Sequence, residues 1–326
     1  MNDLPGLEEI RTAAEAVYRW MPATPQYTWP LLNARAGAEV WVKHENHTPV
    51  GAFKIRGGLV YMERLRKAHP EVTTLISATR GNHGQSVTYA AARHGLRTVI
   101  VVPLGNSVEK NASMRALGAE VIEVGEDFQA ATEHAMKLER EHGWHRVKSF
   151  DVALVAGVAT YALEFFSAAP ELEQVYVPIG MGSGVAGIIA VRDALGLKTK
   201  VVGVTSSLAR ATFLSLAQGE VVEAPAMTAI ADGVSCRKPD ALAISVAQAG
   251  VDRVIEVEDA EVEEAMRAYF ADTHNVAEGA GAIGLAALLK DSARGSGRVG
   301  TVLSGGNVDS NVFARVLGGK ARAANA

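Results

Sequence analysis

A single lysine lies in a sequence context that suits chemistry. Residues 51–58 read GAFKIRGG, which places Lys54 between Phe53 and an Ile-Arg pair, with glycines on both sides. A lysine on a solvated face needs no such surroundings. An amine that takes part in a reaction must be partly desolvated, because it has to lose its proton before it can act. The pattern therefore predicts a reactive lysine at position 54.

A glycine-rich loop is the second chemical feature. The stretch VPIGMGSGVAG (177–187) joins an apolar run to a helical pattern. Its glycines let backbone amides approach an anion closely, and the N-terminus of the following helix favours negative charge. Phosphate binding is the functional interpretation, and a tight strand-to-helix turn is the structural one. No Gly-Lys-Ser/Thr follows, so the loop is not a P-loop.

Two further loops carry polar side chains beside glycines. In SATRGNHGQS (77–86), Asn82 and His83 lie where a substrate would bind, although helix capping by Asn82 with an incidental His83 explains the loop too. In LSGGNVDS (303–310), Ser304 offers a hydroxyl, and an ordinary turn is the alternative. Taken together, an amine, a phosphate cradle, an anion-binding loop and a hydroxyl fit pyridoxal 5′-phosphate. Lys54 would hold its aldehyde as a Schiff base and Ser304 its ring nitrogen.

The elements that must position these residues are short β-branched runs that alternate with helical patterns. Strands are predicted at 38–45, 73–79, 97–103, 119–125, 174–180, 200–206, 253–258 and 300–306. Most runs are apolar throughout, which indicates parallel strands covered by helices on both faces, and hence an α/β fold. In such sheets, ligands bind beyond the carboxyl ends of the strands.

Length and composition limit the possible functions. A chain of 326 residues is long enough for two lobes with a cleft between them. A net charge of −4 gives no indication of binding to nucleic acid or to an anionic membrane. No apolar run is long enough to span a bilayer. The single cysteine, Cys236, excludes an internal disulfide. We expect a cytoplasmic protein that acts on a small molecule, with a frayed tail at 318–326.

Five motifs, in order along nearly the whole chain, carry a family resemblance. AFKIRGG, TRGNHGQ, the glycine loop with GVAG, VAEGAGA (276–282) and LSGGNVD resemble the fold-type II pyridoxal-phosphate enzymes, specifically the serine/threonine dehydratase and serine racemase group. The resemblance implies a two-lobed, tryptophan synthase β-like fold with open, mostly parallel sheets. It implies a small domain at 50–148, a large cofactor-binding domain made of 1–49 and 149–326, and a homodimer.

The resemblance also implies roles for individual residues. Lys54 would be the Schiff-base lysine, Phe53 would pack by the ring, and Asn82 would bond the phenolic oxygen of the cofactor. Glu278 would lie near the ring and Ser304 at its nitrogen. The phosphate would rest on Gly180, Met181, Gly182, Ser183 and Gly184, and the substrate carboxylate on Thr79, Arg80, Gly81, Asn82 and His83. The implied reaction is β-elimination of water from an L-β-hydroxy-α-amino acid, with Lys54 as general base, giving a 2-keto acid and ammonia.

Arg80 departs from the family pattern. It stands where serine racemases carry a serine that serves the second face of the α-carbon, and an arginine stays protonated, so we expect poor racemisation. Arg80 could form a structural ion pair, stack on an aromatic substrate such as 3-phenylserine, or bind the second carboxylate of 3-hydroxyaspartate. We favour an arylserine, because no second basic residue is evident in these loops. Threonine or serine dehydration remains an alternative.

Other departures concern metals and activity. Thr205, Ala209 and Ala211 stand where relatives with a structural divalent cation show acidic residues, so we predict no metal at that site. Met181 and Ser183 interrupt the usual glycine run. A cofactor-binding protein without dehydratase activity, a racemase and a β-replacement synthase of the cysteine synthase kind are the less favoured alternatives.

Overall fold

The computed structural model describes residues 4–169 and 171–319, so positions 320–326 of the predicted frayed tail lie outside the described residues. Its strands are β1 (Gln26–Thr28), β2 (Glu39–His44), β3 (Thr74–Ala78), β4 (Arg97–Val102), β5 (Glu120–Glu123), β6 (His145–Arg146), β7 (Gln174–Pro178), β8 (Lys200–Ser206), β9 (Arg253–Val257) and β10 (Arg298–Leu303). Its α-helices are α1 (Leu7–Tyr18), α2 (Pro30–Ala36), α3 (Lys54–Ala68), α4 (Asn82–Ala92), α5 (Val108–Ala116), α6 (Phe128–His142), α7 (Val152–Ala168), α8 (Ser183–Ala194), α9 (Ala211–Gln218), α10 (Ala241–Gly250), α11 (Asp259–Thr273), α12 (Gly279–Lys290) and α13 (Ser310–Gly318). Two 3₁₀ turns, η1 (Asp232–Val234) and η2 (Ser292–Arg294), complete the description.

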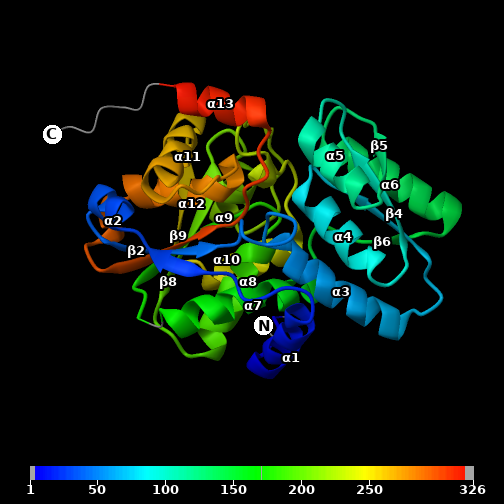
Figure 1. The fold of residues 1–326 in the computed structure, drawn as a ribbon, viewed down its shortest axis with the longest axis horizontal. Coiled ribbons are helices and arrows are strands. Elements are labelled where there is room, and N and C mark those ends of the chain that lie inside the picture. The colour runs from blue at the N-terminus through cyan, green and yellow to red at the C-terminus, as the bar shows by residue number, and fades with distance from the viewer. Residues whose placement is uncertain (1–3, 170, 320–326) are drawn as a thin grey trace.

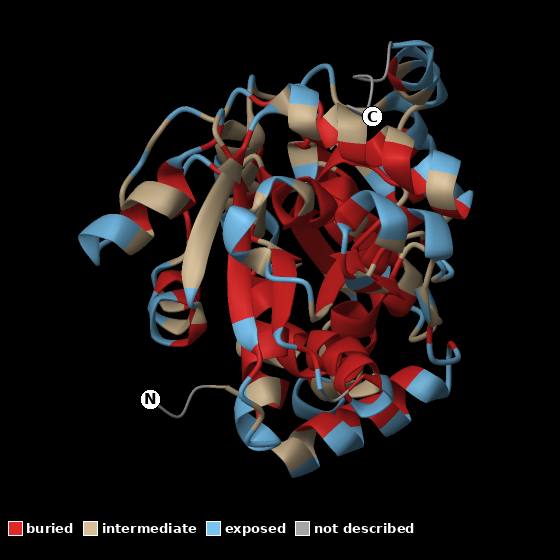
Figure 2. Ribbon diagram, turned by 90° about the vertical axis from the view of Figure 1, so that its left-hand side faces the viewer, coloured by how far each residue is buried: buried red, intermediate tan, exposed pale blue. Residues whose placement is uncertain are grey.

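The larger sheet has the strand order β1-β2-β10-β7-β8-β9. Every pair in it is parallel except β1 with β2. Helices α7 and α8 cover one face and helices α2, α11 and α12 the other, so the central strands are buried on both sides (Figures 1 and 2). This double burial is the physical reason that these strands read as continuous apolar runs.

The smaller sheet has the order β5-β4-β3-β6 and is parallel throughout. Alternate residues of β4 face opposite layers: Val99 and Val101 pack on α6, whereas Ile100 and Val102 pack toward Met114 of α5. In Figure 1 this sheet and its helices form a separate group of elements beside the larger sheet. All eight predicted strands are present and the α/β class is confirmed, while β1 and β6 were not predicted.

A largely buried ion network holds the start of α3. The guanidinium of Arg56 donates to Glu45 and Glu164, with Nε 2.8 Å from Glu45 Oε2 and Nη1 2.7 Å from Glu164 Oε1. Its remaining donors reach the hydroxyls of Thr160 and Thr24. Lys43 joins the network through Glu164. Because Arg56 lies two residues after Lys54, the network fixes the turn that carries the reactive lysine.

Among residues 4–169 and 171–319, we find no helix that is both long and apolar enough to cross a membrane.

Candidate active site

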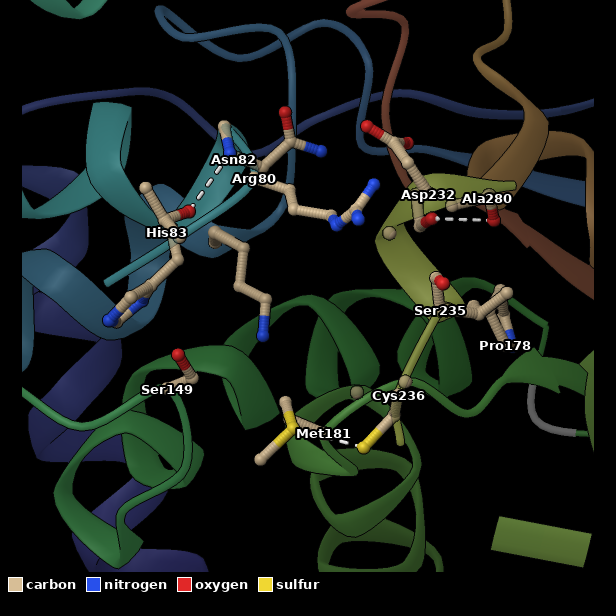
Figure 3. Close-up of a pocket in the computed structure, with 18 of the residues that line it drawn as sticks. Arg80, Asn82, His83, Ser149, Pro178, Met181, Asp232, Ser235, Cys236 and Ala280 are labelled. Atoms are coloured by element: carbon tan, nitrogen blue, oxygen red, sulfur yellow. Dashed lines mark hydrogen bonds between the residues drawn. The ribbon is translucent and has the colours of Figure 1, made fainter. Parts of the chain in front are cut away.

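One pocket gathers the loops that follow the carboxyl ends of β3, β7 and β10, together with the start of α3. All fourteen residues predicted from the sequence line it. They are Phe53, Lys54, Thr79, Arg80, Gly81, Asn82, His83, Gly180, Met181, Gly182, Ser183, Gly184, Glu278 and Ser304. Figure 3 shows Arg80 and Asn82 on one wall and Asp232 and Ser235 on the opposite wall. Their common location is an observation, and their individual roles remain predictions.

Lys54 begins helix α3 and its amine lies beside the glycine loop. Nζ donates to Ser183 Oγ at 2.9 Å and lies 5.0 Å from the centroid of the Phe53 ring. Part of the side chain is open to the pocket, but the surrounding protein excludes bulk water. This burial lowers the pKa of Lys54 from its ordinary value to about 8. A substantial fraction of the amine is therefore neutral near physiological pH, as a nucleophile or base requires.

The lowered pKa predicts how the protein without cofactor combines with pyridoxal phosphate. Only the neutral amine attacks an aldehyde, so the association rate should rise with pH and level off above a midpoint of about 8. An ordinary lysine would give a midpoint of about 10.4. Stopped-flow measurement of association from pH 6 to 10 checks this, and a rate that still rises steeply beyond pH 9.5 contradicts it.

The glycine loop fits a phosphate group. Gly182 has φ +96°, in the left-handed region, and a Cβ there would lie 2.7 Å from the Cβ of Ala243. A Cβ on Gly180 would lie 2.4 Å from the carbonyl oxygen of Gly233. Helix α8 starts at Ser183, so its first backbone N–H groups have no intrahelical partners and are available to an anion. The tight-turn interpretation also holds, because the same glycines that shape the turn expose these amides.

Asn82 is held by partners from the larger sheet. Its Nδ2 donates to Glu278 Oε1 at 2.5 Å, and its Oδ1 accepts from Asn307 Nδ2 at 2.9 Å. Asn82 is the first residue of α4, the cap residue is Gly81, and the first-turn N–H of Gly84 donates to Thr79 Oγ1 at 3.3 Å and not to Asn82. The capping alternative is therefore wrong, because the Asn82 amide is committed to Glu278 and Asn307 instead.

A lysine that the motifs did not reveal, Lys110, also contacts Glu278. Lys110 of α5 donates to Asp232 Oδ2 at 2.7 Å, and its Nζ lies 3.0 Å from Glu278 Oε2. Burial opposes the charge of Lys110, but Glu278 and Asp232 outweigh it and raise its pKa above the ordinary value. Burial raises the pKa of Glu278, and the lysine only partly offsets this. The positive charge of Lys110 is thus already matched by two carboxylates.

Arg80 and His83 line the pocket, and each has a buried nitrogen without a hydrogen-bond partner among the described residues. Among the described residues, no carboxylate forms an ion pair with Arg80, and its buried Nε has no hydrogen-bond partner. The structural ion pair considered for Arg80 is therefore not formed within the part of the chain that the structure describes. His83 Nε2 is also buried without a partner. Burial, and then the charge of Lys54, lower the pKa of His83 to about 3, so its ring is neutral.

Sequence reasoning missed ten lining residues: Lys110, Phe128, Ser149, Pro178, Asp232, Gly233, Val234, Ser235, Cys236 and Ala280. Pro178 and Ala280 lie within the motifs VPIGMGSGVAG and VAEGAGA but carry no polar side chain, and the other eight lie outside the quoted motifs. Lys110 and Phe128 lie at helix starts that resemble ordinary solvated turns. Only the fold brings them to the pocket. In the described ranges, no group of three or more His, Cys, Asp or Glu side chains could hold a metal ion.

Comparison with known proteins identifies the family. The family model described as pyridoxal-phosphate dependent enzyme matches residues 20–305. The chain is 31% identical to an L-threonine ammonia-lyase of Thermotoga maritima, with 95% of this chain and 78% of the relative aligned. It is 30% identical to an L-threo-3-hydroxyaspartate ammonia-lyase of a Pseudomonas species, covering 97% of this chain and 99% of the relative. Maize serine racemase superposes with a TM-score of 0.88 at 26% identity, covering 95% and 96% of the two chains.

The fold and the pocket are those of a two-sheet α/β enzyme with a half-buried lysine beside a glycine-rich loop. The chain belongs to the family of pyridoxal-phosphate-dependent enzymes. The family and the cofactor expected from the five motifs are confirmed by this match.

Proposed function

We propose that the protein is a dehydratase that converts an L-β-hydroxy-α-amino acid to a 2-keto acid and ammonia. The observation that carries the proposal is the position of Lys54, whose amine, with a pKa of about 8, faces Ser183 of the glycine loop. Bound pyridoxal phosphate would supply the electron sink that makes the α-proton of an amino acid removable. Lys54 would hold the aldehyde until the substrate amine displaces it, and the freed Lys54 amine would then take the α-proton as general base.

The other pocket residues divide between cofactor and substrate in this proposal. Residues 180–184 would hold the phosphate, Phe53 the ring face, Asn82 the phenolic oxygen, and Glu278 the ring edge. Ser304, whose hydroxyl donates to the Ala280 carbonyl at 3.3 Å, would face the ring nitrogen. A hydroxyl is a poor acid, which favours elimination over transamination. The amides and side chains of residues 79–83 would hold the substrate carboxylate.

An arylserine such as 3-phenylserine is the substrate class we favour. Arg80 and Phe128 line both the main pocket and a smaller cavity that adjoins it. The other basic side chains nearby are already paired: Lys110 with Asp232, Arg237 with Asp127, and Lys238 with Glu223. An aromatic side chain needs one cation and an apolar wall, which Arg80 and Phe128 would supply.

3-Hydroxyaspartate is the second candidate, and the unpaired guanidinium of Arg80 is the observation that favours it. The Pseudomonas relative is named for this substrate. A dicarboxylate brings two negative groups, however. Of the pocket-lining arginine and lysine side chains in the described residues, Arg80 and Lys54 have no carboxylate partner, and Lys54 is assigned to the cofactor. Threonine or serine remains a third candidate.

Substrate selectivity separates these candidates. For 3-phenylserine, Arg80→Ala should lower kcat/KM by about 30-fold and Phe128→Ala by about 10-fold, because each variant loses a contact of roughly 1–2 kcal/mol. Threonine is the comparison substrate, and it should lose less than 3-phenylserine in either variant, because it shares the carboxylate held by residues 79–83 but offers no aromatic ring. Keto acid release provides the measurement. If the protein prefers 3-hydroxyaspartate, Arg80→Ala should cost more than about 100-fold while Phe128→Ala costs little. Equal losses for all substrates would show that neither residue sets specificity.

Several parts of the proposal extend beyond the pocket. We propose residues 50–148 as the small domain, a homodimeric assembly and a cytoplasmic location. Racemase activity is less favoured, because Arg80 offers no base on the second face of the α-carbon. A protein that binds the cofactor without turnover would show the visible absorption of bound pyridoxal phosphate and release no keto acid.

A further inference from the structure

Asn307 makes hydrogen bonds to two segments near the active site that lie far from it in the sequence. Its Nδ2 donates to the carbonyl oxygen of Val50 at 2.8 Å and to Oδ1 of Asn82 at 2.9 Å. Val50 lies just before the Lys54 turn, and Asn82 begins the helix after the substrate loop. Asn307 does not line the pocket, so any influence on the cofactor passes through another residue.

The backbone carbonyl of Val50 determines which way the side-chain amides of Asn307 and Asn82 face. A carbonyl oxygen only accepts, so the group of Asn307 that faces Val50 must be the NH₂. The same NH₂ faces Asn82, so Asn82 must present its oxygen to Asn307. The Nδ2 of Asn82 then points the other way and donates one of its two hydrogens to Glu278 Oε1 at 2.5 Å. Its second hydrogen remains for the cofactor.

The surroundings leave Asn307 little freedom to turn. Gly51 has φ +67°, and a Cβ at that position would lie 2.6 Å from Asn307 Oδ1. Gly306 N donates to Gly51 O at 2.9 Å, which ties the two loops together. Beyond Glu278, Lys110 holds the other carboxylate oxygen at 3.0 Å. The series of contacts that runs from Val50 through Asn307, Asn82 and Glu278 to Lys110 is therefore anchored at both ends.

We propose that Asn307 is a positioning residue that fixes the side-chain amide of Asn82 so that it donates, rather than accepts, toward the bound cofactor. This inference rests on the family's cofactor and on the proposed contact between Asn82 and the phenolic oxygen. A donor stabilises the deprotonated oxygen and lowers the pH at which the bound cofactor titrates. Reversal of the amide would place the Asn82 oxygen there and raise that pH.

Asn307→Asp keeps the shape but removes both donors. Asn82 must then turn to donate to the new carboxylate, so the pH midpoint of the visible absorption of the loaded protein should rise by about one pH unit, a tenfold change. The matched control is Asn106→Asp. Asn106 also donates to an asparagine, Asn111 Oδ1 at 2.7 Å, but neither residue lines the pocket, so this variant should leave the midpoint unchanged.

A double-mutant cycle distinguishes positioning from a direct effect of the new charge. If Asn307 acts through Asn82, adding Asn307→Asp to Asn82→Ala moves the midpoint no further than Asn82→Ala alone. A shift of the same size in both backgrounds, or no shift in either, overturns the proposal. If the aspartate variant does not fold, Asn307→Ala enters the same cycle, with a smaller rise expected because the amide is freed rather than reversed.

The outcome is separable from the fate of the proposed function. A wild-type protein that titrates but releases no keto acid refutes the dehydratase while the cycle still decides the role of Asn307. A wild-type protein with no visible band overturns the cofactor site and this inference together.

Discussion

Replacing Lys54 with alanine is expected to reduce kcat for a β-hydroxy amino acid by at least about 10²–10⁴-fold, the range that loss of a general base produces. The variant loses both the amine that bonds the aldehyde and the base for the α-proton. Its visible absorption after incubation with pyridoxal phosphate should disappear as well. Keto acid release and absorption spectra provide the two measurements.

The control for this variant is Lys67→Ala. Lys67 lies on the same helix, but its side chain is 75% exposed and pairs with Glu63 in the preceding turn. We expect its kcat to match the wild type. Turnover by Lys54→Ala within tenfold of the wild type would show that another group is the base.

Replacing Arg56 with alanine is expected to lower the free energy of unfolding by about 3–5 kcal/mol. The substitution leaves Glu45 without its guanidinium partner in a site where both side chains are 0% exposed. Glu164 keeps Lys43 but loses its contacts with Arg56. An unpaired buried carboxylate carries a large desolvation cost, and that cost dominates the change. Urea unfolding at pH 7 measures it.

Arg64→Ala is the matched control, because Arg64 lies on the same helix and pairs with Glu9, with side chains 39% and 41% exposed. Exposed pairs contribute about 0–1 kcal/mol, so this variant should unfold almost like the wild type. If the two variants lose equal stability, the buried network does not hold α3.

The sequence alone predicts those strands and helices whose residue pattern is local. Strands such as β4 and β7 are buried on both faces, and their β-branched runs can be read without the fold. The three-residue β1 and two-residue β6 are too short to show any periodicity. Their pairing depends on neighbours that only the folded chain supplies.

The pocket was predicted where glycine loops carry it and missed where side chains meet across the fold. Lys110 meets Asp232 at a separation of 122 residues, and Asn307 meets Asn82 at 225. No local pattern encodes such a pair. For the same reason the sequence could not show that Asn82 bonds Glu278 instead of capping its helix, or that Arg80 has no carboxylate partner among the described residues.

The central claim is that the amine of Lys54 bonds the aldehyde of pyridoxal phosphate whose phosphate rests on residues 180–184. Borohydride reduction of the loaded protein, followed by peptide mapping, tests it most directly. We predict one pyridoxyl group per chain, on the peptide that contains Lys54. An unmodified Lys54, or an adduct on a different lysine, would contradict the account.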